Sequence, residues 1–265
     1  MKYLTSKEIN LLPPKKGGHK GDNGRVLIIG GSMDYVGAPY LSGIAALRIC
    51  ADYVVVACPK KVGWAINRLS PDLITKKFEC EYFTKNQAKE VLKFSEKFDA
   101  VLIGNGLSDR KETLEFAKIV ITNLNKIQKP LVIDADALKI VDISKLENAI
   151  LTPHKKEYET LLKNSKFKDI KKLIGTNIII KKGPVDEIIT KEKTYYNKTG
   201  CDRMAVAGTG DILAGLAVGL LAKGLKPKVA AKAAVFISGR LGEQAKKHHG
   251  NNFIASDLLN LIKKM

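Results

Sequence analysis

The sequence predicts an α/β protein in which helices cover both faces of a central, mostly parallel sheet. Short runs of β-branched residues alternate with helix-length segments along most of the chain, which is typical of parallel sheets. Several of these runs are apolar without alternation, as expected for strands that are buried on both sides. After residue 197 only helical patterns remain. We therefore expect a three-layer αβα architecture with a helical C-terminal quarter.

The expected elements follow one another in a regular order. Strands are predicted at residues 25–30, 53–58, 100–104, 130–134, 149–152 and 177–182. The polar-flanked segment 186–197 predicts a hairpin after the last of these strands. Helices are predicted near residues 38–51, 85–96, 110–125, 137–142, 155–162, 167–174, 210–223, 227–246 and 256–264. Thr84 and Gln87 have capping-box spacing, which marks the start of one helix. No linker or repeat divides the chain, so we expect one domain over residues 1–265.

Composition favours a globular, cytoplasmic protein. Of the 265 residues, 45% are hydrophobic and 27% are charged, a balance that excludes extensive disorder. The longest nearly apolar run, Ile212–Ala222, is too short to cross a bilayer, and Met1–Glu8 lacks the apolar segment of a secretory signal. Four widely spaced cysteines form no zinc-binding pattern, and we expect them to be reduced and mostly buried: Cys50, Cys58, Cys80 and Cys201.

The net charge of +18 raises the question of nucleic-acid binding. The positive residues are nearly all lysines, and they are scattered from Lys2 to Lys264 rather than gathered in one motif. They also lack the arginine and aromatic interleaving of an RNA-binding surface. We therefore interpret them as a solvated coat and do not expect nucleic acid as a partner. The positive electrostatic field of these lysines also attracts anionic small molecules such as nucleotides.

The most informative segment is Gly208-Thr209-Gly210-Asp211, which opens a predicted helix. The two glycines let the backbone approach an anion, and the free N–H groups of the first helical turn point at it. This predicts a cradle for phosphate. Asp211 has two interpretations. It could meet the helix dipole as a capping residue, or it could accept a proton from a substrate hydroxyl beside the phosphate.

The common nucleotide and hydrolase motifs are absent. The sequence contains no G-x-x-x-x-G-K-[ST], and Gly104-Asn105-Gly106 lacks the third glycine of a dinucleotide fingerprint. No Gly-x-Ser-x-Gly elbow occurs either, which argues against a serine hydrolase.

Several segments, in this order, resemble the ADP-dependent NAD(P)H-hydrate dehydratases, which are ribokinase-like enzymes that repair hydrated nicotinamide cofactors. The resemblance covers nearly the whole chain. The matching segments are His19–Gly21, Gly24–Ser32, Tyr35–Ser42, Ile103–Leu107, Val132–Leu138, Leu151–Glu157, Lys182–Gly183 and Met204–Gly215. The resemblance implies a ribokinase-like fold in which strand carboxyl ends and the helix start at Gly208–Asp211 form one cleft. It also makes a functional role for Asp211 the favoured interpretation.

The resemblance implies a reaction in which ADP phosphorylates the hydroxyl of the hydrated ring of NADHX or NADPHX, in the S form. Loss of phosphate then restores NADH or NADPH, and AMP and phosphate are the other products. Phosphate is a far better leaving group than hydroxide, so catalysis consists mainly of positioning and charge stabilisation. Mg²⁺ would assist as cofactor. The rival interpretation is a small-molecule kinase of the same superfamily, acting on an alcohol such as hydroxyethylthiazole.

The resemblance also implies site residues. Four would contact the hydrated cofactor: Ala38, Gly106, His154 and Asp211. Eight would hold the adenine nucleotide: Lys182, Gly183, Pro184, Val185, Asp186, Gly208, Thr209 and Gly210. Glu157 would organise magnesium through water.

Most of these residues also have structural interpretations. Ala38 could be helix packing, Gly106 a turn glycine, His154 a satisfied histidine and Glu157 an acidic residue of the first helical turn. For Asp134 and Asp136, which follow one predicted strand, N-capping explains at least one, and the other could contact a ligand.

The chain departs from the family pattern at several positions. Asn105 stands where the family usually has proline, and Ser108 where it usually has glycine. Pro184, Val185 and Asp186 replace small or hydroxyl residues, and Ser238 replaces a family histidine, so no histidine role is carried over to that helix.

The family is often tetrameric, and its longer members carry an epimerase domain ahead of the dehydratase. Because matching segments begin near His19, we expect epimerisation by a separate protein.

Overall fold

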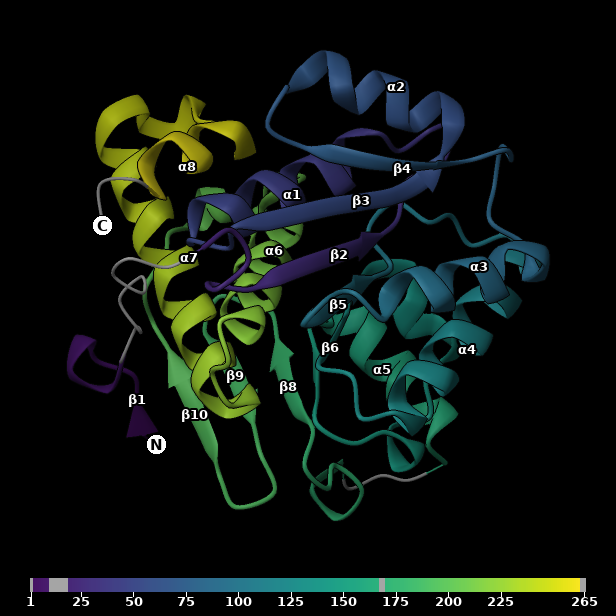
Figure 1. Cartoon of the computed structure of the whole chain (residues 1–265). Coiled ribbons are helices and arrows are strands. Elements are labelled where there is room, and N and C mark those ends of the chain that lie inside the picture. Colours follow the sequence, from purple (N-terminus) through teal and green to yellow (C-terminus); the bar gives the residue numbers. More distant parts are fainter. Residues whose placement is uncertain (1, 10–18, 167–169, 263–265) are drawn as a thin grey trace.

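The computed structural model describes residues 2–9, 19–166 and 170–262 and is built around one sheet (Figure 1). Its strands are β1 (Lys2–Tyr3), β2 (Arg25–Ile29), β3 (Tyr53–Pro59), β4 (Ile74–Phe78), β5 (Ala100–Ile103), β6 (Leu131–Ile133), β7 (Ala149–Leu151), β8 (Ile178–Lys181), β9 (Asp186–Ile189) and β10 (Thr194–Asn197). Their order across the sheet is β1-β10-β9-β8-β7-β6-β5-β2-β3-β4. Only β9, among these described strands, runs antiparallel to its neighbours. The predicted mostly parallel sheet is confirmed.

The α-helices are α1 (Gly37–Arg48), α2 (Lys60–Leu69), α3 (Lys85–Ser95), α4 (Lys111–Lys126), α5 (Lys155–Asn164), α6 (Thr209–Ala222), α7 (Pro227–His249) and α8 (Ala255–Leu261). Short 3-10 helices are η1 (Ser6–Glu8), η2 (Ala135–Ile140), η3 (Ile143–Lys145), η4 (Ile170–Lys172), η5 (Asp202–Ala205) and η6 (Gly250–Asn252). After the β9–β10 hairpin the described chain is helical, which confirms the expectation for the C-terminal quarter.

Two hydrophobic cores lie on opposite faces of the sheet, because successive side chains of a strand alternate between its faces. In β2, Val26 and Ile28 pack in one core, whereas Leu27 and Ile29 pack in the other. The first core contains buried residues of α1, α2, α6, α7 and α8. The second contains those of α3, α4 and α5, which Figure 1 shows grouped on one side of the sheet. The expected three-layer αβα arrangement is confirmed.

Close packing of α6 on α1 sets where the first turn of α6 lies. α6 is buried around nearly its whole circumference, and two of its glycines face α1. A Cβ at Gly215 would lie 2.3 Å from the Ser42 carbonyl oxygen, and one at Gly219 would lie 2.5 Å from a methyl of Ile49. The two glycines have no side chain, and this lets α6 pack directly against α1.

Several local expectations are confirmed. Thr84 and Gln87 form the predicted capping box at the start of α3, and 186–197 forms the predicted hairpin. The helix expected at 137–142 is instead the 3-10 helix η2. Of the helix expected at 167–174, residues 167–169 lie outside the described residues and 170–172 form η4. The end of the helix expected at 256–264 also lies outside them.

Two of the described strands and one α-helix, β1, β4 and α2, were not predicted from the sequence, nor were the 3-10 helices η1, η3, η5 and η6. β4 is an edge strand in which Lys76 and Lys77 are only partly exposed. Their ammonium groups lie over aromatic rings, Lys76 over Phe78 and Lys77 over the exposed Trp64 of α2. A lysine can pack the aliphatic part of its side chain on an apolar surface, so a strand that contains such lysines looks polar in the sequence. This explains why β4 was not predicted.

The four cysteines are free, but the expectation that they are mostly buried is wrong. Cys58 is buried and Cys50 is exposed, and the other two are partly buried. Burial raises the pKa of Cys58 to about 12 and that of Cys80 to about 11, so both thiols stay protonated. Among the described residues, no helix is both long enough and apolar enough to span a bilayer.

Candidate active site

Polar residues that follow four neighbouring strands meet the start of α6 at one edge of the sheet. Asn105 follows β5, Asp134 follows β6, Thr152 follows β7 and Lys182 follows β8. Because these strands are parallel and adjacent, their carboxyl ends lie side by side. A Cβ added to Gly210 would lie 3.3 Å from the Lys182 ammonium, which brings the first turn of α6 to the same place. The predicted convergence of strand ends and helix start is therefore present.

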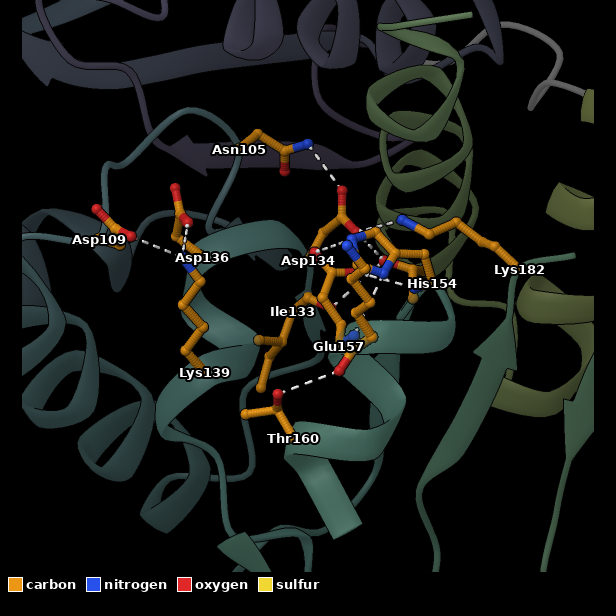
Figure 2. Close-up of polar contacts among 12 residues, drawn as sticks. Asn105, Asp109, Ile133, Asp134, Asp136, Lys139, His154, Glu157, Thr160 and Lys182 are labelled. Atoms are coloured by element: carbon orange, nitrogen blue, oxygen red, sulfur yellow. Dashed lines mark hydrogen bonds and ion pairs between the residues drawn. The ribbon is translucent and has the colours of Figure 1, made fainter. Parts of the chain in front are cut away.

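Asp134 lies at the centre of this cluster and is almost fully buried (Figure 2). Its carboxylate accepts hydrogen bonds from Thr152 Oγ1 at 2.6 Å, Asn105 Nδ2 at 3.0 Å and Lys182 Nζ at 3.1 Å. The charge of this carboxylate is thus compensated by one cation and two neutral donors. Asp134 precedes η2 but makes no side-chain cap there, so N-capping is the wrong interpretation for Asp134.

Asp136 stabilises a neighbouring loop, whereas Asp134 belongs to the polar cluster. Its carboxylate accepts a hydrogen bond from the Ser108 backbone N–H at 3.1 Å and pairs with Lys139 at 2.9 Å. Ser108 has a φ of 80°, in the left-handed region that favours glycine. The hydrogen bond to Asp136 holds this strained loop in place.

Lys182 is a partly buried cation whose ionisation is favoured by three carboxylates. Burial lowers the pKa of Lys182, but the charges of Asp134, Glu157 and Asp211 outweigh it and leave the pKa above its usual value. The lysine therefore stays charged. Its position against Gly210 places a positive charge beside the free N–H groups of the first turn of α6. An anion there would be stabilised both by the Lys182 charge and by these N–H groups.

The Asp211 carboxylate turns toward the strand ends and accepts a hydrogen bond from Asn105 Nδ2. Burial raises the pKa of Asp211 to about 6, and the charge of Asp134 adds to the rise, whereas Asn105 and Lys182 act against it. A carboxylate with this pKa is a competent proton acceptor near neutral pH. Both interpretations of Asp211 agree with this geometry: the residue lies in the first turn of α6, and its carboxylate is able to accept a proton.

The expected phosphate cradle has the backbone geometry that it requires. Gly208 has a φ of 97°, and a Cβ there would lie 2.6 Å from Leu41 and 2.8 Å from Ala255. Only glycine therefore fits. The Thr209 hydroxyl is committed to the loop, since it donates to the carbonyl oxygens of Met204 and Val206. Any contact of Thr209 with a nucleotide would come from its backbone N–H.

The turn after Lys182 is closed by Asp186. The Gly183 backbone N–H donates to Asp186 Oδ1 at 3.1 Å, and Asn197 Nδ2 donates to Oδ2 at 3.2 Å. Burial raises the pKa of Asp186 above its usual value despite these bonds. Pro184 and Val185, between them, are exposed. Asp186 thus shapes the turn with its side chain, and the exposed residues of the turn are the ones accessible to a ligand.

His154 and Glu157 form the cap of α5. The Glu157 N–H donates to His154 Nδ1 at 3.2 Å, and the His154 N–H donates to Glu157 Oε2 at 2.8 Å. The His154 side chain is 54% exposed, with its other nitrogen, Nε2, 3.5 Å from Glu157 Oε1, whereas the Glu157 side chain is 14% exposed. The first-turn interpretation of Glu157 is confirmed, and a metal role is not tested by this geometry.

The site has no preformed metal cage. Among the described residues, no group of three or more His, Cys, Asp or Glu side chains could hold a metal ion. A metal ion bound here would have to take most of its ligands from phosphate and water, as Mg²⁺ does at nucleotide sites.

Gly106 and Ala38 lie together beside this edge. Gly106 has a φ of 67°, and a Cβ there would lie 2.8 Å from Tyr35 Cβ and 3.3 Å from Ala38 Cβ. Close packing at the start of α1 therefore explains both small residues, and contact with a ligand stays a prediction for each.

Sequence reasoning missed Asn105 and Thr152 as members of the site and left Asp134 ambiguous. The signal was present: each is a polar residue within two positions of the end of a buried apolar strand, and the three strands are consecutive. Such residues project into the crevice where open α/β sheets bind ligands.

Comparison with known sequences gives a consistent family. A sequence model of the NAD(P)H-hydrate dehydratase family matches residues 26–264. The bifunctional NAD(P)H-hydrate repair enzyme Nnr of Methanothermobacter thermautotrophicus is 41% identical over 98% of this chain and 53% of that protein. This chain thus spans about half the length of the first curated relatives that it matches. The ADP-dependent (S)-NAD(P)H-hydrate dehydratase of Cenarchaeum symbiosum is 34% identical over 94% of this chain and 90% of its own length.

A solved structure agrees with the sequence comparison. The ADP/ATP-dependent NAD(P)H-hydrate dehydratase of Bacillus subtilis, co-crystallised with ATP and Mg²⁺, has a TM-score of 0.82 and 25% identity to this chain. The match covers 99% of this chain and 98% of that one. The expected ribokinase-like fold is confirmed. Since the family model and relatives above 30% identity cover most of the sequence, this chain belongs to the NAD(P)H-hydrate dehydratase family.

Proposed function

We propose that the protein catalyses the ADP-dependent dehydration of the S form of hydrated NADH or NADPH, giving the reduced cofactor, AMP and phosphate. One observation carries this proposal: the partly buried carboxylate of Asp211 lies in the same helical turn as the glycine cradle, beside the Lys182 ammonium. A proton acceptor and an anion site are thus adjacent, as phosphoryl transfer to a hydroxyl requires. The names of the matched relatives supply the substrate.

In the proposed complex, the nucleotide phosphates lie at the N-terminus of α6. The backbone N–H groups of Gly208, Thr209 and Gly210 and the Lys182 ammonium bind them. The exposed turn Gly183–Val185, closed by Asp186, borders the nucleotide. The hydrated cofactor contacts Asp211, His154 and the small residues Ala38 and Gly106, where close packing leaves little side-chain bulk.

The reaction has two stages, phosphoryl transfer and elimination of phosphate. The ring hydroxyl attacks the terminal phosphorus of ADP, Asp211 accepts the hydroxyl proton, and the bond from this phosphorus to the bridging oxygen breaks to release AMP. The carbon–oxygen bond of the phosphorylated ring then breaks, phosphate leaves with the electron pair, and loss of a neighbouring ring proton restores the double bond. The raised pKa of Asp211, about 6, matches it to the first proton transfer.

Mg²⁺ is the proposed cofactor. Bound to the phosphates, with Glu157 contacting it through water, it would neutralise the charge of the phosphate oxygens.

The test is direct. Hydrated NADH, ADP and Mg²⁺ are incubated with the protein, and the return of dihydronicotinamide absorbance is followed together with AMP and phosphate. We expect all three to appear in step, and Asp211→Asn to lower turnover by about 10²-fold or more while nucleotide binding persists. A folded wild-type protein that restores no absorbance would reject the proposal. A phosphorylated alcohol that accumulates would favour the rival kinase.

We also propose a cytoplasmic homotetramer. Free thiols such as the four cysteines persist in a reducing compartment. Closed homo-oligomers are common among soluble enzymes. Light scattering of the purified protein decides the oligomeric state, and a monomer at assay concentration would reject the tetramer.

A further inference from the structure

The Asn105 side chain is a bridge between the two carboxylates of the site. Its amide nitrogen donates to Asp134 Oδ2 at 3.0 Å and also to Asp211 Oδ1. Asn105 has no exposed surface and follows β5, whereas Asp134 follows β6 and Asp211 belongs to α6. One side chain therefore joins three separate elements.

We propose that Asn105 is a positioning residue that holds the Asp211 carboxylate in the orientation and the ionised state in which it accepts the substrate's hydroxyl proton. This rests on the function proposed above for Asp211. With one oxygen bound to Asn105, the carboxylate cannot rotate freely, and the other oxygen remains for the substrate.

The amide can occupy the bridge in one orientation only. Its two hydrogens face two carboxylates, and the flipped amide would point a carbonyl oxygen at both. In the observed orientation the Asn105 carbonyl oxygen Oδ1 is buried and has no hydrogen-bond partner among the described residues. A buried polar atom without a partner is unfavourable for folding. The amide therefore donates hydrogen bonds to both carboxylates although its own oxygen stays without a hydrogen bond.

The backbone of Asn105 has its own structural role, separate from that of its side chain. Its carbonyl oxygen accepts a hydrogen bond from the Gly31 N–H at 2.9 Å, and Gly30 packs closely against the same oxygen. Any residue supplies this carbonyl group. Beyond this backbone contact, the amide side chain acts through its hydrogen bonds to the two carboxylates: it satisfies the buried Asp134 and holds Asp211.

The charges around Asp211 explain why a neutral donor is useful here. Asp134 faces Asp211 from the end of β6 and disfavours its ionisation, whereas Lys182 faces it from the end of β8 and favours it. Lys182 is shared with Asp134, at 3.1 Å, and with the charge of Glu157. Asn105 opposes the combined effect of burial and Asp134 without adding a charge.

The experiment titrates Asp211 directly and separately from turnover. Protein labelled with ¹³C at aspartate carboxyl carbons is titrated by NMR, and the Asp211→Asn variant identifies the Asp211 signal. In Asn105→Ala, and in the nearly isosteric Asn105→Leu if the first folds poorly, the Asp211 midpoint should rise by about one pH unit. The midpoint of the acidic limb of the kcat/KM pH profile should shift to higher pH by the same amount. The maximal value of kcat/KM should fall.

A matched control is Asn67→Ala on α2. The Asn67 amide nitrogen also donates, at 2.9 Å, to the Leu73 carbonyl oxygen, but it lies beside the edge strand β4. This variant should leave both the Asp211 midpoint and the acidic limb unchanged.

An unchanged Asp211 midpoint in the Asn105 variants would overturn the proposal, and so would a shifted midpoint with an unchanged acidic limb. Wild-type protein without turnover would instead reject the proposed function, and the NMR titration would still decide whether Asn105 holds Asp211.

Discussion

Replacing Asp211 by asparagine should make the protein more stable at neutral pH while it lowers the proposed turnover. Burial and the nearby Asp134 raise the pKa of Asp211 from 3.8 to about 6, so ionisation of this carboxyl is costly in the folded state. Asparagine keeps the shape and an oxygen that can accept the Asn105 hydrogen bond, but it carries no charge. The variant therefore removes an electrostatic penalty that the function requires.

The size of the effect follows from the pKa. A pKa about two units above the unfolded value corresponds to about 3 kcal/mol, which is an upper value for the stabilisation. Because the native state binds this proton more tightly than the unfolded chain, the carboxyl lowers stability as pH rises from about 4 to about 6. The advantage of Asp211→Asn should be complete above about pH 6 and absent below about pH 4. At neutral pH it raises Tm by up to about 6–12 °C.

The assay is urea and thermal unfolding of both proteins at several pH values between these limits. The matched control is Asp202→Asn, because the exposed Asp202 pairs with Lys246 and its pKa is lowered. That variant should gain no stability at any pH. An Asp211→Asn protein that is no more stable than wild type at neutral pH, or whose advantage persists unchanged at pH 4, would refute the reasoning.

Two further variants test the anion site. Gly208→Val should weaken ADP binding, measured by calorimetry, because its Cβ would collide with Leu41; Gly224→Val, at a similarly positive φ but in open space, should leave binding intact. Equal affinity in both would contradict the cradle. Lys182→Met should reduce ADP affinity and destabilise the fold by about 3–5 kcal/mol, since it leaves Asp134 buried without its cation. Adding Asp134→Asn should recover part of the stability in thermal melts; a double variant no more stable than the single one would contradict the pairing.

The central strands were predictable because their surroundings impose a simple pattern. β2, β5, β6 and β7 are buried on both faces, so nearly every residue in them is apolar. β4 has no such constraint at the sheet edge, and its lysines lie on aromatic rings instead of in solvent. η2 was expected as an α-helix because its six residues carry too few turns to distinguish the two periods.

The sequence by itself determined the local parts of the site. Gly208 and Asp211 lie within one helical turn, so the cradle and the neighbouring carboxylate follow from residue order alone. Only the tertiary structure decided that Asn105, Asp134 and Lys182 meet Asp211. These residues are far apart in the chain, and they come together because β5, β6 and β8 are parallel and lie within a few strands of one another in the sheet. Consecutive strands are often neighbours, but the sequence alone does not fix the strand order, which depends on how the connections and helices pack on both faces of the sheet.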